Sequence, residues 1–169
     1  SSDKNELFSP YCLFNCLSLA YLGSEEHTEK EMNNVLCLDF SKEYLPGAFK
    51  DLKRSLLPEG HTQKPLIPTN PLKKNTYQLK IANSAWVNNQ SPLLPEYQHI
   101  LQKVLHAHIA TLSFEDTVKS AHLINHWVNK NTNNKIPELL SPRDIIKDSQ
   151  LILVSALYFK GSWLKPFNA

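Results

Sequence analysis

Leu151-Ile152-Leu153-Val154-Ser155-Ala156-Leu157-Tyr158-Phe159 is a nearly unbroken apolar run, and Lys160-Gly161-Ser162-Trp163-Leu164-Lys165-Pro166-Phe167 follows it. A strand with one face in water would carry polar residues at alternate positions. This run therefore predicts a central strand that is covered on both faces. A central strand also needs a neighbour on each side. We therefore expect these residues to belong to the front part of a larger fold.

The composition is that of an ordinary globular chain. Of the 169 residues, 41% are hydrophobic and 20% are charged, and the formal net charge is +2. This balance gives no reason to expect nucleic acid or a membrane surface as a partner. The longest apolar run is too short for a membrane-spanning helix. The polar start of the sequence is not a signal peptide, and both an extracellular and a cytoplasmic location stay open.

The cysteines do not form a recognisable framework. Cys12, Cys16 and Cys37 are odd in number and lack a CxxC spacing, which argues against paired disulfides and against a zinc site. Cys12 and Cys16 lie four residues apart in an apolar segment, where we expect small buried side chains. This cysteine usage mildly favours a reducing compartment.

The first half of the chain predicts helices. Ser9 can cap a helix whose first turn contains Pro10, and Gly23 is expected to end it in a left-handed conformation. The apolar residues between them predict a helix that is buried nearly all round. Thr28-Glu29-Lys30-Glu31 predicts a capping box for a second helix, with Met32, Val35 and Leu36 as its apolar stripe. Residues 57–79 contain several prolines and lysines and predict a long loop.

The second half mixes strands and helices. Turn residues and hydrophobic periodicity predict the following order: a strand at 78–88, a helix from Pro95 to about Leu105, a strand at 109–114, a helix from about Thr117 to Asn131 that ends at Asn133-Asn134, a turn at 142–144, and the buried strand.

No motif identifies an enzyme. The four glycines form no phosphate-binding loop and no nucleophile elbow. His122 and His126 have metal-ligand spacing, but they lie on the helix face opposite Ile124, so we expect them in solvent rather than on a metal. The members of a Ser-His-Asp or Cys-His site need only meet in space, so the residues alone leave that class open. No cofactor is indicated.

Several blocks of sequence resemble the serpin family. The segment from Asn5 to Pro10, continued by Ala20-Tyr21-Leu22-Gly23-Ser24, is similar to the second helix of serpins and the strand before it. Ile124-Asn125-His126-Trp127-Val128 and Thr132-Asn133-Asn134-Lys135-Ile136 resemble the helix that crosses the main sheet. Leu151 to Phe167, which includes Ala156-Leu157-Tyr158-Phe159-Lys160-Gly161-Ser162-Trp163 and Lys165-Pro166-Phe167, resembles the third strand of that sheet and its exit. Ile81-Ala82-Asn83 and Leu94-Pro95-Glu96-Tyr97 match the second strand and the fifth helix. The blocks occur in family order.

The resemblance implies an α+β fold in which helices pack on a large central sheet, with smaller sheets. Residues 1–169 would form the N-terminal portion of this single domain. A serpin presents a reactive loop to a serine or cysteine protease and, once cleaved, inserts the loop into the main sheet while the protease is still attached. The loop lies near the family's C-terminus, so it is expected beyond residue 169. A monomer is implied for the full-length protein.

The resemblance also implies residues that control opening of the sheet. Ser9, Pro10, Cys12 and Ser155 match the shutter below the opening point, and Trp163 matches the aromatic residue of the breach, where insertion begins. Family members usually have Ser in place of Cys12 and Asn in place of Ser155. Since a thiol is a weak hydrogen-bonding group and Ser is shorter than Asn, we expect a changed network here.

Two functional alternatives remain at this point. One is a protease inhibitor of the suicide-substrate type, and the other is a non-inhibitory serpin that acts as a carrier, chaperone or storage protein. The sequence of the missing hinge would separate them. Glycosaminoglycan binding is a weaker possibility, since Lys64, Lys73, Lys74 and Lys80 lie in and just after a region where some serpins bind heparin.

Overall fold

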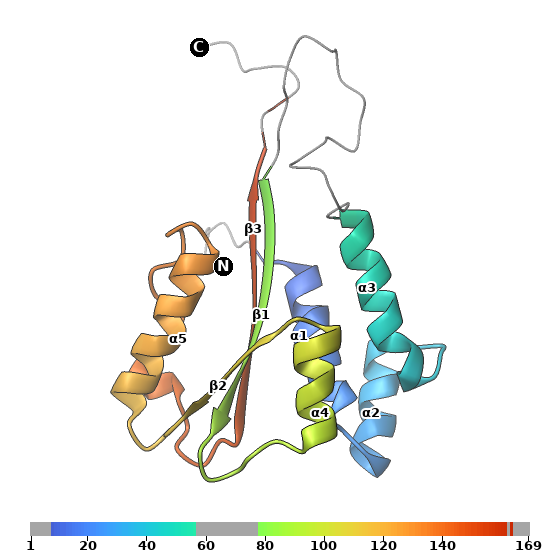
Figure 1. The fold of residues 1–169 in the computed structure, drawn as a ribbon, viewed down its shortest axis with the longest axis horizontal. Helices are drawn as coiled ribbons and strands as arrows, with labels where there is room; N and C mark the ends of the chain where they lie inside the picture. The colour runs from blue at the N-terminus through green and yellow to red at the C-terminus, as the bar shows by residue number, and fades with distance from the viewer. Residues whose placement is uncertain (1–7, 57–77, 162, 164–169) are drawn as a thin grey trace, which may run out of the picture.

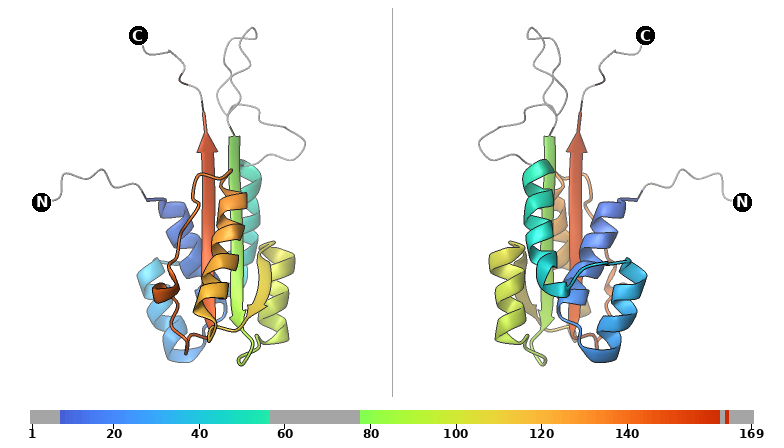
Figure 2. Two further views of the ribbon diagram at one scale, coloured as in Figure 1. Left: turned by 90° about the vertical axis from the view of Figure 1, so that its left-hand side faces the viewer. Right: turned by 90° about the vertical axis from the view of Figure 1, so that its right-hand side faces the viewer.

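The computed structural model describes residues 8–56, 78–161 and 163. In this part of the chain, three strands form one mixed sheet in the order β2-β1-β3. Their bounds are Gln78–Asn88 for β1, His108–Leu112 for β2 and Leu151–Lys160 for β3. Helices cover both faces of this sheet (Figures 1 and 2).

The helices divide unequally between the two faces. Four lie on one side, namely α1 (Pro10–Leu22), α2 (Glu26–Leu36), α3 (Leu45–Leu56) and α4 (Pro95–His99), while α5 (Thr117–Asn131) covers the other side (Figure 2). Short helical turns lie at Lys42–Tyr44, at Ile100–Val104, where α4 continues as a π-helix, and at Pro142–Asp144.

β1 is the central strand of the described sheet and pairs with both others. β1 and β2 are parallel, from Ser84↔His108 to Asn88↔Leu112, and α4 lies in the crossover between them. β1 and β3 are antiparallel over ten residue pairs, from Gln78↔Lys160 to Val87↔Leu151. Among the described residues, no strand pairs with the edge of β3 that faces away from β1.

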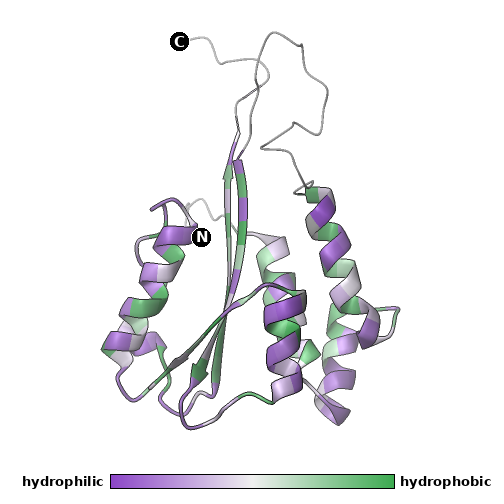
Figure 3. Ribbon diagram, viewed as in Figure 1, coloured by the Kyte–Doolittle hydropathy of each residue, from purple (hydrophilic) through white to green (hydrophobic). Residues whose placement is uncertain are grey.

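The sheet separates two hydrophobic cores. On the α1–α4 side, Leu19, Tyr21 and Leu101 are buried, and Leu153 packs against them. On the α5 side, Trp86, Phe114, Ile124 and Val128 are buried together with Val154. Successive residues in the first half of β3 thus face opposite cores, which confirms coverage on both faces there. The end of the predicted run is not covered, since Phe159 is 63% exposed. Hydrophobic and hydrophilic bands alternate along the helices, as expected for elements with one buried side (Figure 3).

Most predicted elements are confirmed. β1 and α5 have the expected bounds, and the helix from Pro95 buries Leu101 and Leu105. Asn133 and Asn134 adopt left-handed φ angles of 51° and 60° after α5. The strand predicted at 109–114 begins one residue earlier and ends at Leu112. The predicted loop lies outside the described residues, apart from its last two, which belong to β1.

The predicted capping box is wrong. The second helix begins at Glu26, with Glu25 as its N-cap and no side-chain cap. The reason lies in the turn before it, where the Ser24 hydroxyl donates to the carbonyl of Tyr21 at 2.8 Å and fixes a tight reversal after α1. The helix therefore starts before Thr28. Val35, predicted on its apolar stripe, is 76% exposed, whereas Met32 and Leu36 pack against the core.

The prediction that α1 is buried on nearly all sides is also wrong. Leu13 and Leu17 are exposed, because α1 packs on the sheet and α2 with one side only.

Gly23 does not take the predicted left-handed conformation. Its φ and ψ are −96° and −2°, which any residue can adopt. The constraint is close packing instead: a Cβ at this position would lie 2.9 Å from Cζ of Tyr97. The hydroxyl of Tyr97 donates to the carbonyl of Leu19 at 2.8 Å, so the ring cannot easily retreat.

We expect Gly23→Ala to lower the free energy of unfolding by about 1–3 kcal/mol, because the added methyl group meets the held Tyr97 ring. Gly47→Ala is the matched control. Gly47 lies in α3 with open space around its Cα, so that change should stabilise by about 0.5 kcal/mol. Urea unfolding measures both, and a neutral Gly23→Ala variant would contradict the packing argument.

Candidate functional site

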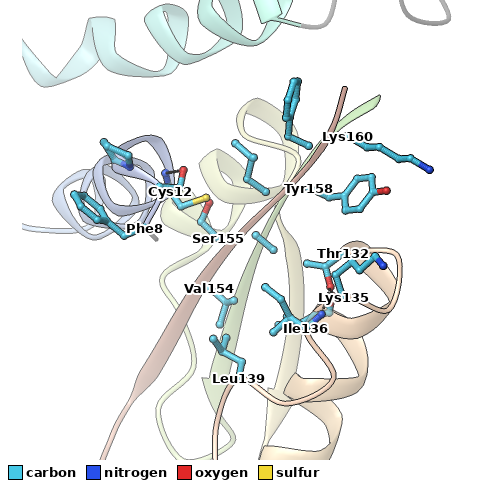
Figure 4. Close-up of a pocket in the computed structure, with 16 residues that line it drawn as sticks. Phe8, Cys12, Thr132, Lys135, Ile136, Leu139, Val154, Ser155, Tyr158 and Lys160 are labelled. Atoms are coloured by element: carbon cyan, nitrogen blue, oxygen red, sulfur yellow. Dashed lines mark hydrogen bonds between the residues drawn. The ribbon is translucent and has the colours of Figure 1, made fainter. Parts of the chain in front are cut away.

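A groove follows the edge of β3 that faces away from β1. Its volume is about 990 Å³. One wall is the start of α1 with Phe8 before it, and the other is the end of α5 with the segment that follows (Figure 4). The side chains that line it are mostly apolar and include Phe8, Pro10, Val128, Ile136, Leu139, Val154 and Leu157.

The first wall is built as the sequence predicts. Ser9 caps α1, and its Oγ accepts a hydrogen bond from the backbone N–H of Cys12 at 3.3 Å. Pro10 occupies the first turn, where its missing N–H costs nothing. Ser9, Pro10, Cys12 and Ser155 all line the groove, so the structure brings the four predicted shutter residues together. Their role in controlling the sheet stays a prediction.

A polar network under the sheet was not predicted. The side-chain amide of Asn15 donates to Oδ1 of Asn83, and the same nitrogen lies 3.3 Å from Oγ of Ser155. Asn83 and Ser155 are direct cross-strand partners, so the network joins α1, β1 and β3. Asn15 is only 1% exposed. The sequence indicated this network only by placing a side-chain amide, Asn15, within an otherwise apolar helix.

The two cysteines of α1 have different surroundings. Cys12 lines the groove, as does Ser155 (Figure 4). Cys16, one turn further along, is not among the lining residues. Burial, reinforced by the nearby Cys12, raises the pKa of Cys16 to about 11, although a hydrogen bond involving the Ser155 backbone opposes the rise. Cys16 therefore stays a neutral thiol at physiological pH.

The second wall is fixed by its own hydrogen bonds. Oγ1 of Thr132 accepts the backbone N–H of Ile136 at 3.2 Å and donates to the carbonyl of Val128 at 2.9 Å. Oδ1 of Asn125 accepts the N–H groups of Leu139 and Leu140 at 2.9 and 3.0 Å. These bonds hold the segment after α5 beside the groove.

Other predicted positions lie away from the groove. Trp163 follows β3, is 73% exposed and is not among the lining residues, so its role in the breach stays a prediction. His122 and His126 are exposed, as expected. Lys80 is exposed and donates to Oδ1 of Asn133, whereas Lys64, Lys73 and Lys74 lie outside the described residues.

Within residues 8–56, 78–161 and 163, no group of three or more His, Cys, Asp or Glu side chains could hold a metal ion. No helix in the same residues is long and apolar enough to cross a membrane.

Comparison with known proteins identifies the family. The family described as Serpin (serine protease inhibitor) matches residues 1–169. The chain belongs to the serpin family. It is 31% identical to human neuroserpin over 167 residues, which are 98% of this chain and 37% of that protein. It is 32% identical to the leukocyte elastase inhibitor of Xenopus laevis, over all of this chain and 41% of that protein.

Solved serpin structures have the same fold. Emu ovalbumin matches with a TM-score of 0.81 and 26% identity, over 99% of this chain and 43% of that one. The chain thus spans about two fifths of the length of the relatives it matches. The α+β fold predicted from the sequence, a serpin N-terminal portion with helices on a mixed sheet, is confirmed. The family contains protease inhibitors and also non-inhibitory ovalbumin.

We expect Asn15→Ala to lower the free energy of unfolding by about 1–3 kcal/mol, because it leaves the Asn83 side chain without its partner beneath the sheet. In a double-mutant cycle with Asn83→Ala, the coupling should exceed about 0.5 kcal/mol. Asn34→Ala, at an exposed position of α2, should change stability by less than about 0.5 kcal/mol. Additive effects of the two network variants would contradict the network.

Combining Cys12→Ser with Ser155→Asn should raise the thermal midpoint, with a gain of about 1 kcal/mol if one buried hydrogen bond is restored. A hydroxyl replaces a weak thiol donor, and the longer amide shortens the 3.3 Å reach from Asn15 to Ser155. Cys37→Ser, at an exposed position, is the control for loss of a thiol. An unchanged or lower midpoint in the double variant would refute this account.

Proposed function

We propose that the polypeptide containing these residues inhibits a protease as a suicide substrate, by inserting its cleaved reactive loop beside β3. The nucleophile of the protease attacks the scissile bond of the loop and forms an acyl-enzyme. Loop insertion then carries the attached protease away before the acyl-enzyme can be hydrolysed. In this proposal residues 1–169 supply the receiving edge and its walls. The proposed activity is inhibition, and no catalytic residue is assigned.

The observation that carries the proposal is the edge of β3, which pairs with no strand among the described residues and lies beside a groove. Strand edges present N–H and C=O groups at regular spacing, so an extended segment gains a ladder of hydrogen bonds when it joins them. The groove walls from α1 and α5 supply apolar contacts on both faces of such a segment. Both requirements for strand addition are therefore present in the described residues.

The names of two relatives suggest which protease to test first. Two proteins with 32% and 31% identity are leukocyte elastase inhibitors, from Xenopus laevis and Xenopus tropicalis. An elastase-type serine protease is therefore the first candidate target, with a cysteine protease as the second class.

The test uses the natural polypeptide with its reactive loop. We expect incubation with an elastase-type protease, or another member of a serine and cysteine protease panel, to give a complex that survives SDS. A covalent acyl-enzyme that cannot turn over would explain such a band. Protease inactivated at its nucleophile is the control and should give none. Cleavage of the polypeptide without any stable complex would contradict inhibition.

The alternative is a non-inhibitory serpin acting as a carrier, chaperone or storage protein. It is supported by the similarity to emu ovalbumin, which is 29% identical over 98% of this chain. The hinge of the reactive loop separates the two functions, because small residues permit insertion while bulky or charged ones oppose it.

Glycosaminoglycan binding also stays a proposal. A structural neighbour, kallistatin, is described as complexed with heparin, but at 24% identity this likeness concerns the fold alone. Lys80, the candidate lysine within the described residues, is engaged with Asn133.

A further inference from the structure

An imidazole contacts two indoles where α5 crosses the sheet. The ring of His108, the first residue of β2, stacks on the ring of Trp127 in α5, with the centroids 6.2 Å apart and the planes at 18°. The same imidazole meets Trp86 of β1 edge to face, at 5.5 Å and 66°. The two indoles also contact each other, at 6.2 Å and 84°. The three rings therefore join α5 to both β1 and β2.

The two indoles are held in place. Trp86 is 4% exposed, and its Nε1 donates to Oγ of Ser84 at 2.9 Å. Ser84 is itself fully buried and is the cross-strand partner of His108. Trp127 packs against the core on the α5 side of the sheet. The ring that can change its charge thus lies against two rings that cannot.

No carboxylate lies on the elements around His108. β1, β2, α5 and the π-helix at 100–104 contain no Asp or Glu. The carboxylates that follow β2 have other partners, since Glu115 pairs with Lys147 at 3.4 Å and Asp116 caps α5. The titratable side chains of the surrounding elements are Lys80, Lys103, Lys119, His122, His126 and Lys130, with His106 just before β2. These groups can only oppose a positive charge on His108, so within these elements its attraction comes from the indoles.

Protonation changes how strongly the imidazole holds the indoles. The face of an indole attracts a cation, which at exposed sites changes an equilibrium constant by about two- to fivefold. The separations of 5.5 and 6.2 Å are close to the reach of this attraction, about 6 Å, and His108 is exposed within the described residues, so this smaller magnitude applies. Histidine changes its charge between about pH 5 and 8. The extra attraction is therefore present in mild acid and is lost as the pH rises.

We propose that His108 is a pH-sensitive attachment of α5 to the sheet. Its protonation tightens the contact with Trp86 and Trp127, and its deprotonation loosens that contact. α5 is also one wall of the groove beside β3, so a tighter attachment in acid slows insertion of a loop. This consequence rests on the proposed function, whereas the attachment itself does not.

The attachment is tested by hydrogen exchange of the natural polypeptide at about pH 5.5 and about pH 8. Protection of the amides at 124–131, corrected for the pH dependence of intrinsic exchange, reports local opening of α5. His108→Phe keeps a ring and removes the charge. Relative to this variant, the natural polypeptide should gain about two- to fivefold in protection on going to the lower pH. An equal pH dependence in both proteins would overturn the proposal.

Two further variants separate the indoles from other sources of pH dependence. His122→Phe makes the same change at an exposed position of α5 and should leave the pH dependence as it is in the natural polypeptide. Trp127→Leu keeps the imidazole but removes the indole on which it stacks, so the gain should fall below about twofold. An undiminished gain in Trp127→Leu, or its loss in His122→Phe, would overturn the assignment to these rings.

The consequence for inhibition is tested by the rate of SDS-stable complex formation at the same two pH values. Dividing the ratio of the two rates by the ratio measured for His108→Phe removes the pH dependence of the protease itself. The natural polypeptide should be about two- to fivefold slower in acid on this scale, and equal ratios would refute slower insertion. If no protease forms a complex at either pH, inhibition is wrong, and the attachment is judged by hydrogen exchange alone.

Discussion

The antiparallel pairing of β1 with β3 is the constraint on which the other features depend. It fixes Asn83 opposite Ser155, and only this register places both side chains under Asn15 of α1. A slip of one residue would turn every β3 side chain to the opposite face and exchange the residues of the two cores. The same pairing leaves the far edge of β3 open and so positions the groove.

The two apolar cores and the polar network stabilise the fold in different ways. The two cores are apolar and hold the helices on the sheet without directional preference. The network of Asn15, Asn83 and Ser155 is directional, and a buried amide without a partner is costly. The cores therefore supply most of the stabilisation, while the network selects one position of α1 along the strands. Cys16 lies beside this network, because the backbone of Ser155 hydrogen-bonds to its thiol.

Local sequence signals predicted much of the fold, and long-range contacts account for what they missed. The cap at Ser9, the strand at 78–88 and the left-handed Asn133 depend on neighbouring residues, and they were predicted. The role of Asn15 depends on partners 68 and 140 positions away, which no local pattern reveals. Gly23 was misinterpreted for the same reason, because the Tyr97 ring that excludes a side chain comes from a distant helix. The grouping of Ser9, Pro10, Cys12 and Ser155 was predicted only through the family resemblance, and the other groove residues were not predicted.

The wall formed by α5 and the segment after it has a mechanical consequence. Its hydrogen bonds through Asn125 and Thr132 run within the wall, whereas Ile124, Val128 and Trp127 meet the sheet through apolar contacts, and the exposed bond from Lys80 to Asn133 is a polar link between wall and sheet. Non-directional contacts of this kind tolerate small sliding displacements better than hydrogen bonds do. A tilt of the wall about the sheet would therefore leave α5 and the β1–β3 ladder intact and would break only the exposed bond from Lys80 to Asn133.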